Sequence, residues 1–65
     1  MFNTLAYDKS NGKIVFNGIL QFLPRIEEQM LINGILYDVC NIVYKLTEGH
    51  STCTNVIIYL AQARR

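Results

Sequence analysis

The side chains that could do chemistry in this chain are concentrated in one polar stretch, residues 47–54. It contains the single histidine, His50, and one of the two cysteines, Cys53, with Glu48 close by. A cysteine acts as a nucleophile when a base is held against its thiol and a third group orients that base. We predict that residues 47–54 form a loop, which would not hold His50 against Cys53. We therefore expect no catalytic residues and predict that the protein is not an enzyme.

The same stretch could instead contact a ligand. Glycine, serine and threonine in one loop offer backbone N–H groups and hydroxyls that can surround an anionic oxygen, as in phosphate-binding nests. An arginine from the same or a neighbouring subunit would add a charge-assisted hydrogen bond. The candidate ligand-binding residues are Arg25, His50, Ser51, Thr52, Thr54 and Arg64. No GxxxxGK[ST] or GxGxxG motif occurs, so the pattern does not specify a nucleotide.

Charge and cysteine spacing argue against several other classes. The net charge of +1 gives no strong field for nucleic acid or an anionic membrane. No apolar run approaches the roughly 20 residues that a membrane-spanning helix needs. Cys40 and Cys53 are not in a CxxC arrangement, so we expect neither a metal site nor another cofactor. The first residues show no signal-peptide pattern, and we expect a cytoplasmic protein with reduced cysteines.

The composition predicts self-association. The 65 residues suffice for a single small domain, residues 1–65. A chain this short buries only about 60% of its unfolded surface. It is 51% hydrophobic and only 17% charged, against about 25% charged in an average domain. One small core cannot enclose so many apolar side chains, so we expect the remainder to form the interface of a homo-oligomer.

The elements that must position these residues are organised around residues 33–46. This stretch opens with Asn33-Gly34, the strongest short-range hairpin signal, because both residues accept the positive φ angles of a type I′ turn. The following run is rich in Ile, Val and Tyr, which is typical of a strand. Residues 2–18 predict an earlier hairpin, with Asn11-Gly12 supplying the positive φ angles of its turn.

Residues 24–32 allow two interpretations. Pro24 followed by Glu27 and Glu28 suits the first turn of a short helix over residues 24–31. A two-residue turn at Asn33-Gly34, however, needs a strand on each side. We therefore favour a strand over residues 28–32 and keep the short helix as the alternative.

The apolar pattern of the stretch 33–46 changes phase. Tyr37 and Val39 share one face, whereas Ile42, Tyr44 and Leu46 share a face in the opposite phase. One extra residue at Cys40-Asn41 would restore the register, so we predict a β-bulge there. A bent strand can serve two sheets, as in small barrels, and we expect each half of this strand to belong to a different sheet.

Residues 55–63 predict a last strand with two apolar faces. Alternation places Val56, Ile58 and Leu60 on one face and Ile57, Tyr59 and Ala61 on the other. In so small a protein the second face is best explained by a partner, so we predict that Ile57, Tyr59 and Ala61 form an oligomer interface. We expect this strand to pair with the second half of the 33–46 strand. The result would be an all-β domain of about five strands, either a small barrel or a strongly bent antiparallel sheet.

One half of the chain resembles a known family. Leu23-Pro24-Arg25-Ile26-Glu27 and the residues up to Gly34, followed by Tyr37-x-Val39-x-x-Ile42-x-Tyr44-x-Leu46, resemble a pattern of small SH3-like β-barrel proteins. Many of these are short proteins of phages and other mobile elements. The sequence departs from the pattern at Glu27, where a glycine is usual. The resemblance implies a five-stranded SH3-like barrel and a binding module, although a fold alone does not give a function.

Two function hypotheses remain open at this point. The first is a non-catalytic binding protein of a phage or mobile element, acting on a protein target as an inhibitor or accessory factor by stoichiometric association. The alternative is a homo-oligomer that sequesters a small anionic, nucleotide-like ligand at a subunit interface. Both assign Ile57, Tyr59 and Ala61 to the contact between subunits.

Overall fold

The computed structural model describes residues 1–47 and 50–63, and the side chains of residues 47 and 50–54 lie outside this description. The described residues form five β-strands and no helix. The strands are β1 (Phe2–Asp8), β2 (Lys13–Leu20), β3 (Gln29–Ile32), β4 (Ile35–Thr47) and β5 (His50–Gln62). The prediction of an all-β domain with about five strands is confirmed.

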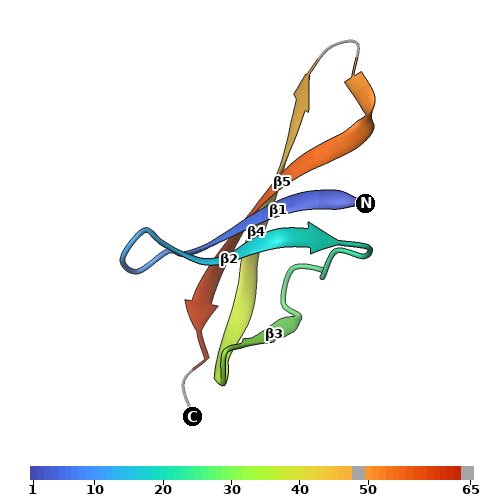
Figure 1. Ribbon diagram of the computed structural model, residues 1–65. Coiled ribbons are helices and arrows are strands. Elements are labelled where there is room, and N and C mark those ends of the chain that lie inside the picture. Colours follow the sequence, from blue (N-terminus) through green and yellow to red (C-terminus); the bar gives the residue numbers. More distant parts are fainter. Residues whose placement is uncertain (48–49, 64–65) are drawn as a thin grey trace.

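The strands form one strongly curled sheet with the shape of half a barrel (Figure 1). Their order is β2-β1-β5-β4-β3, so β5 lies between β1 and β4. It pairs along β4 from Tyr37 to Thr47, not only with the second half of β4 as predicted. The bend is as predicted, but the sheet is mixed, because β1 and β5 run parallel. Parallel neighbours need a long connection, and here the three intervening strands provide it.

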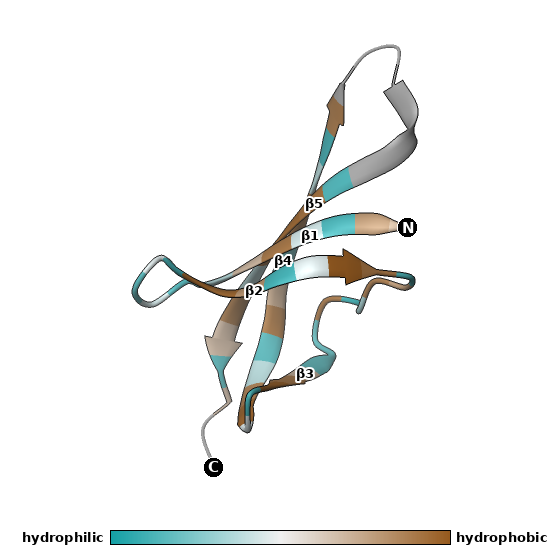
Figure 2. Cartoon of the chain, viewed as in Figure 1, coloured by the Kyte–Doolittle hydropathy of each residue, from teal (hydrophilic) through white to brown (hydrophobic). Residues whose placement is uncertain are grey.

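The core lies on the concave face and is centred on β5. Val56, Ile58 and Leu60 are 0–1% exposed, which confirms the predicted alternation of this strand. Ala6 on β1 is paired with Ile58, and Val39 on β4 is paired with Leu60. Figure 2 shows the apolar residues along the middle of β5. Further partly buried side chains complete the core: Phe2, Val15, Phe16, Leu20, Leu23, Met30, Ile32 and Ile42.

Strand β4 contains the predicted bulge. Its pairing with β5 shifts between Val39 and Asn41, so Cys40 is the additional residue. Because of this shift, Tyr37, Val39 and Ile42 all contribute to the same core although their spacing breaks strict alternation. The predicted division of β4 between two sheets is wrong. All of β4 belongs to one sheet, and the extra residue turns the side chains on both sides of the bulge toward the same core.

The two Asn-Gly pairs form different turns. Asn33 and Gly34 have φ angles of 49° and 81°, as the predicted type I′ turn between β3 and β4 requires. The connection of β1 to β2 is longer. There only Gly12 has a positive φ, 71°, and its N–H donates to the carbonyl of Asp8 at 2.8 Å. The first hairpin is therefore closed by a four-residue loop, and its asparagine does not adopt the predicted positive φ.

Residues 25–28 form a tight turn before β3. The N–H of Glu28 donates to the carbonyl of Arg25 at 3.0 Å, and Glu27, the third residue of the turn, has a φ of 78°. This is the φ of a type II turn, which normally has glycine at that position. The backbones of Glu27 and Glu28 also exchange hydrogen bonds with Val39 on β4, at 3.0 and 2.9 Å. The alternative of a helix over residues 24–31 is wrong, because Glu27 has left-handed backbone and β3 begins at Gln29.

The positive φ of Glu27 leads to a stability prediction. Glu27→Gly should raise the free energy of unfolding by about 0.5–1 kcal/mol, because removing the strained Cβ outweighs the extra backbone entropy of glycine. Urea unfolding followed by circular dichroism measures this change. Glu27→Ala is the matched control, since it removes the same carboxylate and keeps the Cβ. A Gly variant no more stable than the Ala variant would contradict the strain at this position.

Candidate binding surface

The face of the sheet opposite the core has an apolar centre. Leu5 and Tyr7 on β1 are paired with Ile57 and Tyr59 on β5, and all four side chains are only partly buried. The rings of Tyr7 and Tyr59 are stacked, with centroids 6.0 Å apart and an interplanar angle of 23°. A sheet with one face toward water normally carries polar residues on that face. Here the two central strands carry apolar ones.

Neighbouring strands extend this centre. Ile14 on β2 is paired with Tyr7, and Val43 on β4 is paired with Ile57. Both are exposed, at 54% and 39%. The bulge at Cys40 is the reason that Val43 lies on this face, because an unbroken alternation from Val39 would place it with the core residues. We call Leu5, Tyr7, Ile14, Val43, Ile57 and Tyr59 the outer patch.

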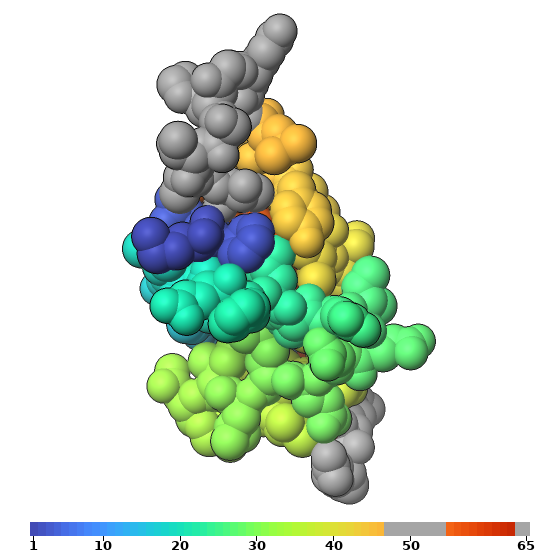
Figure 3. Space-filling view, turned by 90° about the vertical axis from the view of Figure 1, so that its right-hand side faces the viewer, coloured from blue at the N-terminus to red at the C-terminus, as the bar shows by residue number. Residues whose placement is uncertain are grey.

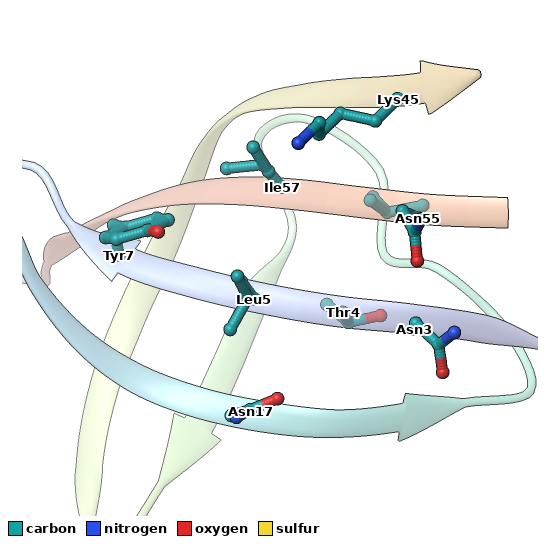
Figure 4. Close-up of a pocket in the computed structure, with 9 residues that line it drawn as sticks. Asn3, Thr4, Leu5, Tyr7, Asn17, Lys45, Asn55 and Ile57 are labelled. Atoms are coloured by element: carbon teal, nitrogen blue, oxygen red, sulfur yellow. The ribbon is translucent and has the colours of Figure 1, made fainter. Parts of the chain in front are cut away.

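One end of the outer patch is hollowed and has a polar border. The hollow has a volume of about 390 Å³, and Leu5 and Ile57 are among the residues that line it. Its polar lining residues are Asn3, Thr4, Asn17, Lys45 and Asn55. Figure 4 shows these side chains around Leu5, with Lys45 extending back toward Ile57. Amide side chains both donate and accept hydrogen bonds, and the lysine adds a positive charge. A smaller hollow of about 260 Å³ lies at the other end, beside Tyr7 and Tyr59.

The predicted oligomer residues lie together on this face. Ile57 and Tyr59 belong to the outer patch, and Ala61 follows them on the same side of β5, paired with Asp38. Sequence reasoning missed Leu5, Tyr7, Ile14 and Val43. Their strand alternation was visible, but their position beside β5 depends on pairings between distant segments. The role of Ile57, Tyr59 and Ala61 as an interface stays a prediction.

The predicted ligand-binding loop is not a loop. Strand β5 begins at His50, which is paired with Thr47 of β4, so residues 50–54 are extended strand. The polar composition concealed this, because composition does not reveal the pairing of Thr47 with His50 that extends the β4–β5 hairpin. The side chains of His50, Ser51, Thr52 and Thr54 lie outside the described residues, as does Arg64. Arg25 is exposed in the connection beside β3, whereas β5 begins at the far end of the β4–β5 hairpin (Figure 1).

Within the described residues, one titratable group has a shifted pKa. Asp8 is 2% exposed, and one carboxylate oxygen accepts hydrogen bonds from the Ser10 hydroxyl at 2.6 Å and the Ser10 backbone N–H at 2.9 Å. The hydroxyl bond and then the N–H bond hold the pKa of Asp8 below its ordinary value of 3.8, against a weaker opposing effect of burial. Asp8 is therefore an anchor of the turn between β1 and β2.

The residues described contain neither a candidate metal-ligand cluster nor a membrane-spanning helix. No group of three or more His, Cys, Asp or Glu side chains in this part of the chain is placed to hold a metal ion. The thiol of Cys40 is free and half-buried, with Sγ 3.7 Å from the carbonyl oxygen of Asp38. No helix able to cross a membrane occurs among these residues.

Comparison with protein-family models, characterised proteins and solved structures finds no match to this chain. The outer patch and its hollows are therefore interpreted from their own geometry and chemistry.

The Asp8 contacts predict how stability depends on pH. Because the folded-state pKa lies below the ordinary value, the stabilisation is fully present above pH 3.8 and is lost as the pH falls through the folded-state pKa. Asp8→Asn should remove this part of the pH dependence in urea unfolding between neutral and acidic pH. Ser10→Ala is the matched control and should weaken the same dependence while the carboxylate remains. If both variants lose stability at acidic pH to the same extent as the wild type, this role of Asp8 is contradicted.

Proposed function

We propose that this protein is a small non-catalytic binding protein that acts as a homo-oligomer, by stoichiometric association with a protein target. The outer patch carries this proposal, because it is an apolar sheet face that no element of the described residues covers. The resemblance of residues 23–60 to SH3-like proteins supports a phage or mobile-element origin and a role as inhibitor or accessory factor.

The composition of the patch supports protein association. Removing apolar surface from water contributes a favourable free energy of about 25 cal/mol per Å². Protein interfaces characteristically combine an apolar centre, rich in tyrosine, with a polar border. The outer patch has this arrangement, with the stacked Tyr7 and Tyr59 near its middle and Asn17, Asn55 and Lys45 at its margin.

A second exposed apolar site provides a surface for the target. Phe22 and Ile26 lie in the connection between β2 and β3 and are 84% and 55% exposed. Backbone hydrogen bonds between Glu27, Glu28 and Val39 hold the turn that carries Ile26, and Phe22 lies in the segment that leads into this turn. Figure 3 shows the connection, in green, on the surface of the molecule. A chain with two apolar surfaces can form an oligomer and bind a target at the same time.

The target contact can be tested with Phe22→Ser/Ile26→Ser. We expect immobilised wild-type protein to retain one partner at a fixed ratio to the subunit, and the double variant to lose at least about tenfold in affinity, since aromatic and apolar anchors dominate interfaces. Capture from cells, followed by isothermal titration with the purified partner, measures both. Arg25→Ala is the matched control, from the same turn, and should bind normally. The proposal would be refuted if the double variant bound the partner with the affinity of the wild type, or if the wild type captured no partner.

The hollow beside Leu5 favours a second candidate function, sequestration of a small anionic ligand with hydrogen-bonding edges, such as a nucleotide. Its volume of about 390 Å³ falls within the range of small-molecule sites. Mass spectrometry of the small molecules released by denaturing the purified protein would test this. A nucleotide lost in Lys45→Ala and retained in Thr52→Ala would locate the ligand in the hollow. The reverse result would locate it at the start of β5, and no released molecule would refute sequestration.

A further inference from the structure

The register of the sheet arranges the outward residues in rows that cross the strands. One central row contains Asn17, Leu5, Ile57 and Val43, and the next contains Ile14, Tyr7, Tyr59 and Asn41. On either side lies a further row. On β4 and β5 the first of these has Lys45 beside Asn55, and the second has Asp38 beside Ala61. Lys45 and Asp38 are the charged residues that β4 contributes, and they lie at opposite ends of the patch.

We infer that the outer patch is covered by the same patch of a second copy of this chain, face to face about a two-fold axis that crosses the strands between the two central rows. This inference rests on the self-association in the proposed function and specifies its partner and geometry. Such a contact is self-complementary, which is the commonest arrangement of protein dimers.

The axis places two apolar residues of one central row on aromatic residues of the other. Leu5 lies opposite the partner's Tyr7, and Ile57 lies opposite the partner's Tyr59. By symmetry, each of these contacts occurs twice. The two sheets would then pack at the separation of about 10 Å that is usual for sandwiched sheets. Ile57 borders both hollows of the patch, so the partner's tyrosines have space to enter beside it.

The same axis pairs the two charges. Lys45 lies opposite the partner's Asp38, and this pair also occurs twice in the dimer. One oxygen of Asp38 accepts a hydrogen bond from Nε2 of Gln29 at 3.0 Å, which leaves the second oxygen for the partner's lysine. The charged residues that β4 contributes to one patch therefore complement those of its own copy, in the orientation that also places Leu5 and Ile57 on the partner's tyrosines.

The other face-to-face two-fold arrangement, about an axis along the strands, lacks this complementarity. It would place Lys45 of β4 against the partner's Ile19 on β2. This isoleucine is the outward residue of that row, and it is apolar. Lys45 would lose water without gaining a carboxylate, which is unfavourable. The charges therefore select the axis that crosses the strands.

A charge exchange tests this geometry. In Lys45→Asp or Asp38→Lys alone, like charges meet twice in the dimer, and the dimer dissociation constant should rise at least about tenfold. The double variant Lys45→Asp/Asp38→Lys restores opposite charges and should return to within about threefold of the wild type. Sedimentation equilibrium measures the constants, and circular dichroism checks that each variant is folded. Arg25→Asp makes the same charge change outside the patch and should leave the dimer unchanged.

Several results would overturn the inference. A wild-type chain that is monomeric at micromolar concentration rules out the dimer. A double variant with a dimer dissociation constant as high as in the single variants rules out the axis. An equal rise of this constant in Arg25→Asp also rules it out. A monomeric chain would also remove the homo-oligomer from the proposed function, but none of these results alters the effect of Phe22→Ser/Ile26→Ser on target binding. Failure of this inference is therefore distinguishable from failure of the target-binding part of the proposed function.

Discussion

The structure depends on one constraint, the position of a strand with two apolar faces in the middle of a single sheet. Strand β5 has hydrogen-bonded neighbours on both edges, β1 and β4, so its backbone is satisfied. Its Val56, Ile58 and Leu60 form the centre of the core face. Its Ile57 and Tyr59 point to the other face. A second layer would cover them in a larger domain, and the described residues form no such layer.

Two irregularities of the backbone, the turn at Glu27 and the bulge at Cys40, meet at Val39. On one edge of β4, the backbone of Val39 holds the turn that contains Glu27, and on the other it is paired with Leu60. The bulge follows immediately at Cys40. It allows Ile42 to join the core and turns Val43 and Lys45 outward. One additional residue in the strand therefore decides both the packing of the concave face and the composition of the outer patch.

The functional interpretation follows from where the surplus of apolar side chains lies. Part of it forms the outer patch over β1 and β5, and part projects from the connection between β2 and β3 as Phe22 and Ile26. The first surface is central and bordered by amides, and the charges that β4 gives it complement those of its own copy. The second consists of Phe22 and Ile26, and backbone hydrogen bonds hold the turn that carries Ile26. This separation is the physical basis for assigning self-association to one surface and target binding to the other.

The sequence by itself determined the features that depend on neighbouring residues. These are the β class, the turn at Asn33-Gly34, the bulge at Cys40 and the alternation of the last strand. Each follows from local φ preferences or from a period of two, which require no knowledge of distant segments. The two apolar faces of residues 55–61 were visible for the same reason, and with them two residues of the outer patch, Ile57 and Tyr59.

Only the tertiary structure decided what depends on long-range pairing. The parallel contact of β1 with β5 brings Leu5 and Tyr7 beside Ile57 and Tyr59, and no local pattern specifies which strands become neighbours. The extension of β5 to His50 comes from backbone pairing with β4 in a segment whose composition indicates a loop. The turn at Glu27 is likewise held by backbone hydrogen bonds with Val39, although a glutamate disfavours the positive φ of this position. Local preference is worth about 1 kcal/mol or less per residue, and contacts across the sheet override it.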